Sequence, residues 1–123
     1  ALGKNEALQK KAYATAISLA ESALEINDQD WKTSALLATY YTFSERENDA
    51  RRQIESALAI SKRNPEALLY AALIYNVQGD MEATLATLEE MIKADGTYRI
   101  YAANEPDLKP LHGNDRFERM INP

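Results

Sequence analysis

The chain offers few side chains whose types and spacing could carry out catalysis. It has one histidine, His112, in a segment that also contains Pro110 and Gly113, and it has no cysteine. A histidine that acts as a general base works on a nucleophile or substrate within hydrogen-bond reach, and no cysteine or evident serine partner accompanies His112. We therefore expect a surface or capping role for His112, and we expect the protein not to be an enzyme.

Metal and phosphate chemistry have equally little support. Asp28 and Asp30 have the D-x-D spacing that begins a calcium loop, but the glycine and the distal glutamate of such a loop are missing. Aspartates at these positions are better explained as helix caps. No glycine-rich phosphate loop is present. The sequence thus predicts no metal site and no cofactor.

The charge balance excludes two classes of partner. The formal net charge is −5, whereas nucleic acids and anionic membrane surfaces attract proteins with concentrated Lys and Arg. No run of 18 apolar residues is present, so we expect no membrane insertion. We predict no nucleic-acid partner. The compartment stays open: the cytoplasm is favoured, and the periplasm would suit a membrane-anchored parent protein.

The sequence contains an internal repeat, which indicates the structural elements that position these residues. The segment ESALEI at 21–26 returns as ESALAI at 55–60, a spacing of 34 residues. A period of this length indicates stacked pairs of antiparallel helices. The same spacing relates Tyr41 to Tyr75, and Ala20 to Ile54 and then to Leu88.

Apolar residues at spacings of three and four predict helices at 12–27, 29–43, 45–62, 65–78 and 81–94. Ser44 and Glu47 have the spacing of a capping box. Asn64 and Asp80 are expected to cap the next two helices, and Gly96 to adopt a left-handed conformation after the last one. Residues 97–123 leave the pattern, and we expect them to cover the exposed end of the last helix pair.

Small and aromatic residues at fixed places in each copy resemble the tetratricopeptide repeat. The resemblance covers about residues 12–96, and Gly79-Asp80 is similar to the usual turn of that family. It implies an all-α solenoid, a right-handed superhelix of antiparallel helix pairs, with about two and a half repeats plus a C-terminal capping segment. The matching residues are Leu37, Ala38, Tyr41, Ala50, Ile54, Ala57, Ala71, Ala72, Tyr75, Thr84, Leu88 and Met91.

The resemblance also implies a domain organisation. We expect an incomplete first repeat at 1–30, repeats at 31–64 and 65–98, and a cap at 99–123, all in one domain. The tail is similar to segments that close such arrays in bacterial multidomain signalling and regulatory proteins. The chain begins without methionine, so we expect a processed or excised piece, and the likeness of the tail implies that it comes from a larger bacterial protein.

By the same resemblance, the function is that of a protein-interaction scaffold whose concave groove binds a peptide or helix of a partner. An apolar groove suits an amphipathic helix or hydrophobic peptide. One alternative is homo-oligomerisation, since about three repeats are usually needed for stability; another is a ligand-binding or enzymatic helical domain. The expected groove residues are Lys32, Ala35, Leu36, Thr39, Thr42, Phe43, Glu66, Leu69, Tyr70, Leu73 and Asn76.

Overall fold

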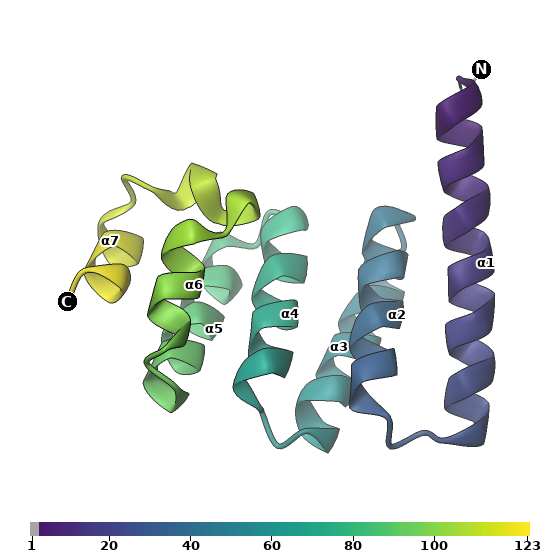
Figure 1. Ribbon diagram of the computed structural model, residues 1–123, viewed down its shortest axis with the longest axis horizontal. Helices are drawn as coiled ribbons and strands as arrows, with labels where there is room; N and C mark the ends of the chain where they lie inside the picture. Colours follow the sequence, from purple (N-terminus) through teal and green to yellow (C-terminus); the bar gives the residue numbers. More distant parts are fainter. Residues whose placement is uncertain (1–2) are drawn as a thin grey trace. The chain divides into compact units, whose positions relative to one another are not determined.

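The computed structural model describes residues 3–123, and within this range the regular elements are all helices (Figure 1). The all-α prediction is therefore confirmed. The chain divides into two compact units, Ala1–Lys62 and Arg63–Pro123, which we call unit 1 and unit 2. Unit 1 contains α1 (Lys4–Ile26), α2 (Trp31–Phe43) and α3 (Glu47–Ile60). Unit 2 contains α4 (Pro65–Val77), α5 (Met81–Ala94), α6 (Tyr98–Asn104), the 3-10 helix η1 (Pro106–Leu111) and α7 (Asp115–Ile121).

In unit 1, α2 packs against both α1 and α3. A cluster of Ile17, Ala20, Leu37, Tyr41 and Ala50 joins the three helices, with Leu24 and Tyr40 packed against it. Ala20 of α1 and Ala50 of α3 are small side chains that allow α2 to approach closely, and Tyr41 of α2 packs in the same cluster. The Tyr41 hydroxyl donates a hydrogen bond of 2.8 Å to the Glu21 carboxylate, which ties α2 to α1 at the edge of the cluster.

In unit 2, α4 and α5 form the main hairpin, and the C-terminal elements pack onto it. Phe117 of α7 is fully buried, as are Leu108 of η1 and Ala102 of α6. The helix α6 ends at Asn104 because Glu105 precedes Pro106, and a residue before proline is disfavoured in the helical conformation. Asn76 of α4 donates from Nδ2 to the Asp107 carbonyl at 3.0 Å, which fastens η1 to α4.

The helix bounds repeat at the spacing of 34 residues that the sequence predicts. The helices α2 and α4 have 13 residues each, α3 and α5 have 14 each, and every start and end in the second pair lies 34 residues after its counterpart. The turns repeat as well: Arg46 donates its backbone N–H to Tyr41 O at 2.8 Å, and Asp80 donates to Tyr75 O at 3.0 Å. The two hairpins are copies of one structural unit.

The turn between α2 and α3 places Glu45 in the left-handed region, with φ 60°. Its counterpart in the second hairpin is Gly79, with φ 77°. Glycine adopts this conformation without steric cost, whereas a residue with a Cβ is strained there. The same backbone turn is therefore built from a suited residue in unit 2 and from a less suited one in unit 1.

Several local expectations need correction. The helix α1 begins at Lys4 rather than at 12, because residues 4–11 are mostly good helix formers. Ser44 forms no capping box: it ends α2, and Arg46 precedes α3 without a side-chain cap. Gly96 is not left-handed, since α5 ends in extended backbone at Asp95.

The remaining caps follow the expected chemistry. Asn64 accepts a hydrogen bond from the Glu66 N–H at 2.8 Å, and Asp80 accepts one from the Ala83 N–H at 3.1 Å, as predicted. Asp30 accepts from the Thr33 N–H at 3.2 Å, so it is the residue that caps α2. Asp30, Asn64 and Asp80 thus fix where α2, α4 and α5 start.

Candidate functional site

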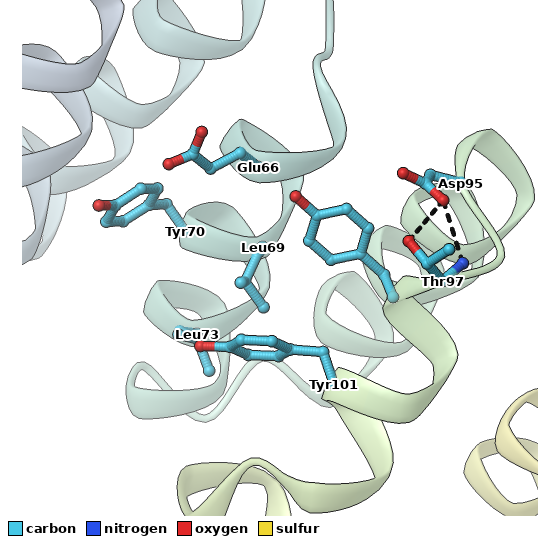
Figure 2. A pocket seen from close by; sticks show the side chains of 8 residues that line it. Glu66, Leu69, Tyr70, Leu73, Asp95, Thr97 and Tyr101 are labelled. Atoms are coloured by element: carbon cyan, nitrogen blue, oxygen red, sulfur yellow. Dashed lines mark hydrogen bonds between the residues drawn. The ribbon is translucent and has the colours of Figure 1, made fainter.

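A surface pocket of 580 Å³ lies in unit 2, between α4 and α6 (Figure 2). Ligand pockets in proteins have volumes of roughly 300–1,000 Å³, so this one is large enough to receive a ligand or several side chains of a partner. The α4 helix contributes one wall, and the loop after α5 and the start of α6 contribute the other. The lining residues are Glu66, Leu69, Tyr70, Leu73, Asp95, Thr97, Tyr98 and Tyr101.

The α4 wall is set by helical spacing. Glu66 and Tyr70 are four residues apart, as are Leu69 and Leu73. The two residues of each pair therefore lie one helical turn apart on the same side of α4. The opposite side of α4 is fixed by fully buried residues, among them Leu68 and Ala72. The start of the helix is fixed by the Asn64 cap. The residues facing the pocket are therefore presented by a rigid helix.

The α6 wall is set by a hydrogen-bonded turn. Asp95 Oδ1 accepts from the Thr97 backbone N–H at 3.0 Å and from the Thr97 hydroxyl at 2.7 Å, and α6 starts at the next residue. These hydrogen bonds from Thr97 hold the pKa of Asp95 below its usual value. Tyr98 and Tyr101 then follow three residues apart, with ring centroids separated by 6.3 Å and planes tilted by 44°.

The pocket combines aromatic walls with acidic charge. Figure 2 shows the ring of Tyr101 extending from α6 toward α4, with Asp95 beside Thr97. Burial raises the pKa of Tyr101, and the negative charge of Glu105 and a hydrogen bond accepted by its carboxylate raise it further. Two of the lining residues, Glu66 and Asp95, carry carboxylates, and none of the lining residues described is Lys, Arg or His. The lining is therefore aromatic and acidic, with the aliphatic side chains of Leu69 and Leu73 on the α4 wall.

Four of the predicted groove residues meet in this pocket: Glu66, Leu69, Tyr70 and Leu73. Asn76, the fifth on α4, does not line it. The residues that sequence reasoning missed are Asp95, Thr97, Tyr98 and Tyr101. The 34-residue register gave no signal for the two tyrosines, because Tyr98 and Tyr101 correspond to Asn64 and Ala67, which were not expected groove positions.

The predicted residues of α2 lie in unit 1. Phe43 stacks on Tyr13 of α1, with ring centroids 5.8 Å apart and an interplanar angle of 14°, and its side chain remains half-exposed. Lys32 lies over the Trp31 ring at 5.8 Å. Leu36 is exposed, Thr39 is half-buried, and Ala35 and Thr42 are buried.

One face of α1 is uncovered. Leu8 and Leu19 are 59% and 68% exposed, and they line a shallow hollow with Ala12 and Ala16. In the 34-residue register Leu19 corresponds to half-buried Gln53 and buried Thr87, and Ala23 corresponds to Ala57 and Met91, which are both buried. The exposed face of α1 is thus equivalent to positions that are mostly buried in α3 and α5.

Residues 3–123 contain neither a cluster of metal-binding side chains nor a helix that could span a membrane. No group of three or more His, Asp or Glu side chains there could hold a metal ion. None of the helices in that range is long and apolar enough to cross a bilayer.

The fold and pocket define an all-α protein built from repeated helical hairpins, and comparison with known proteins adds one partial likeness. No family model and no solved structure matches the chain. The BBSome complex member BBS4 of Bos taurus is 34% identical over 87 residues, which are 70% of this chain and 17% of that protein. The chain thus matches less than a fifth of the length of this relative, whose name describes it as a member of a complex.

Proposed function

We propose that this chain is a protein-interaction module of the tetratricopeptide type, which binds a peptide or a helix of a partner protein. The observation that carries the proposal is the pocket beside α4. Four residues assigned to a binding groove from the sequence line a hollow of 580 Å³. The repeated hairpins support the repeat class, and the likeness to a member of a protein complex supports a protein partner.

Preformed walls favour binding, because a rigid helix loses little conformational entropy when a partner docks. Aromatic side chains at the pocket are also the residues that most often dominate binding energy at protein interfaces. The module would then act as a scaffold within a larger protein, and no catalytic step is part of this role. The length of the relative supports a larger parent protein. Its bovine source does not support the expected bacterial origin of that parent.

Selection of short peptides from a display library on the whole chain tests this proposal. We expect enriched peptides whose affinity falls about tenfold or more in Tyr70→Ala, since a central aromatic anchor is commonly worth 2 kcal/mol or more. Val77→Ala is the matched control, because Val77 is an exposed apolar residue of α4 outside the pocket. Equal affinity for both variants, or no enrichment on the wild-type chain, would contradict the proposal.

Homo-oligomerisation is a second candidate, and the uncovered face of α1 favours it. Pairing of two such faces would bury Leu8 and Leu19, which are exposed in the single chain. Sedimentation of the chain over a range of concentrations separates the two functions. A dimer that Leu19→Glu dissociates would support self-association, whereas a monomer at every concentration would exclude it.

A further inference from the structure

We infer that two copies of this chain pair through the exposed face of α1, with the two α1 helices side by side and antiparallel. This inference rests on the second candidate function, self-association, and gives its geometry. It does not depend on the pocket beside α4.

The first argument is a regular row of residues along α1, which we call the α1 seam. Its six residues follow one another at alternating spacings of four and three, which is the spacing of the a and d positions of a coiled coil. All six are exposed in the single chain. The three large ones, Leu8, Leu19 and Ile26, are 59%, 68% and 89% exposed. The α1 seam consists of Leu8, Ala12, Thr15, Leu19, Ser22 and Ile26.

The α1 seam lies away from the core of unit 1. Each helical residue is rotated by about 100° from the one before it, which places Ile17 and Ala20 on the other side of α1 from the seam. Ile17 and Ala20 are buried in the cluster with Leu37 and Tyr41 of α2. Pairing through the seam therefore buries exposed apolar side chains and leaves the contacts of α1 with α2 intact.

The second argument is the length of α1. This helix has 23 residues, whereas α3 and α5 have 14 each. In the 34-residue register Tyr13 corresponds to Glu47, the first residue of α3, so residues 4–12 of α1 have no counterpart in α3.

This extra length favours a second α1 as the occupant of the seam. At 1.5 Å per residue α1 is about 34 Å long, whereas a helix of the length of α2 is about 20 Å long. A helix like α2 from a neighbouring repeat would leave one end of the seam uncovered. An antiparallel α1 from a second copy covers the seam from Leu8 to Ile26.

The third argument is the distribution of charge along α1. The segment 4–13 contains three lysines and one glutamate, and the segment 14–26 contains two glutamates and no basic residue. An antiparallel pair therefore places the basic half of each helix beside the acidic half of the other. Charges that flank a coiled-coil seam set the orientation of the two helices.

The pairing of flanking charges follows from the heptad positions. Lys11 and Glu25 are two heptads apart and flank the α1 seam on the same edge. In the antiparallel pair Lys11 of each copy lies beside Glu25 of the other, and the two-fold symmetry forms this contact twice. In a parallel pair Lys11 would lie beside Ala16 of the second copy, and neither contact would form. The opposed seam residues in the antiparallel pair are Leu8 with Ile26, Ala12 with Ser22, and Thr15 with Leu19.

The experiment measures the dimer dissociation constant of the whole chain by sedimentation at low ionic strength, where exposed charge pairs are least screened. Lys11→Glu and Glu25→Lys each bring like charges together at both contacts, so each should weaken the dimer about tenfold. An equimolar mixture of the two variants should form a heterodimer about as tight as the wild-type dimer, because both of its contacts then join opposite charges. The double variant should also dimerise like the wild type.

Lys10→Glu is the matched control. It makes the same change of charge one residue away from Lys11, on the side of α1 opposite to the seam, and should change the dissociation constant less than about twofold. All three substituted residues are exposed, so the circular dichroism of each variant should match that of the wild type.

The outcomes separate this inference from both candidate functions. A wild-type chain that stays monomeric at every concentration would overturn the inference and self-association together, and would leave the α1 seam to a helix of another protein or repeat. A dimer that neither charge variant weakens would preserve self-association and refute pairing through α1. If both variants weaken the dimer and their mixture does not restore it, the antiparallel arrangement is wrong. The peptide-binding proposal is tested separately by the display selection.

Discussion

The hydroxyl of Tyr41 gives the sharpest test of how unit 1 is held together. Burial of the phenol and its hydrogen bond to Glu21 raise the pKa of Tyr41 to about 12. In an unfolded chain a tyrosine has a pKa of about 10. Between these two values the unfolded chain loses the proton while the folded chain retains it, so the free energy of unfolding falls as pH rises through this window. The stability from this group is fully present below about pH 10.

The magnitude follows from the size of the shift. A difference of one pKa unit corresponds to about 1.4 kcal/mol, so a shift of about two units predicts a loss of about 2–3 kcal/mol by pH 12. Tyr41→Phe removes the ionisable hydroxyl and keeps the ring, which lies under the Arg46 guanidinium at 4.3 Å. At neutral pH the variant should be about 1 kcal/mol less stable, because it lacks the hydrogen bond to Glu21.

The assay is urea unfolding of both proteins at a series of values from about pH 8 to about pH 12. Lysines and the other tyrosines titrate alike in the two proteins, so their effects cancel in the difference. We expect the wild-type curve to start above that of Tyr41→Phe and to cross it as pH rises. Parallel curves across the whole range would refute the reasoning, since they would mean that folding does not shift the pKa of Tyr41.

Two further predictions concern unit 2. Phe117→Ala should reduce the free energy of unfolding by about 3–5 kcal/mol, because the side chain is fully buried; urea unfolding measures this, and exposed Arg119→Ala should change it by less than about 0.5 kcal/mol. The hydrogen bond from Arg63 lowers the pKa of Glu90, so the stability from this pair is present above the unfolded pKa of about 4.3 and is lost as pH falls through the lower folded value. Both side chains are half-exposed, so we expect this acid-dependent loss of stability to be less than about 1 kcal/mol. Glu90→Gln should abolish it, so the melting temperature of the variant should fall less steeply below about pH 5. An unchanged slope would contradict the prediction.

The fold was predictable because its determinants are local and repeat. The bounds of α4 and α5 follow from Asn64, Pro65 and Asp80, whose side chains act on the next few backbone N–H groups. The prediction of a capping box at Ser44 was wrong because backbone hydrogen bonds close the turn of the first hairpin. As a result, α2 extends to Phe43 and α3 begins only at Glu47. A four-residue pattern does not reveal which of two overlapping turns the backbone adopts.

Half of the candidate site was predictable for a similar reason. Glu66 and Tyr70 were assigned from the register of α4, which the sequence shows directly. Tyr98 and Tyr101 could not be assigned so, because their position depends on how α6 packs against α5, η1 and α7, which follow no repeat in the sequence. The acidic and aromatic character of the pocket emerges only when both walls are present.

The contrast between Glu45 and Gly79 has a practical consequence for protein design. The second hairpin has a side-chain cap at each of its helix starts and a glycine at the left-handed turn position, whereas the first relies on a strained glutamate and an uncapped start at Arg46. An engineer who wished to string identical modules into a longer rod should copy residues 64–95 rather than 30–61. In the natural first module, Glu45→Gly would relieve the strained turn position.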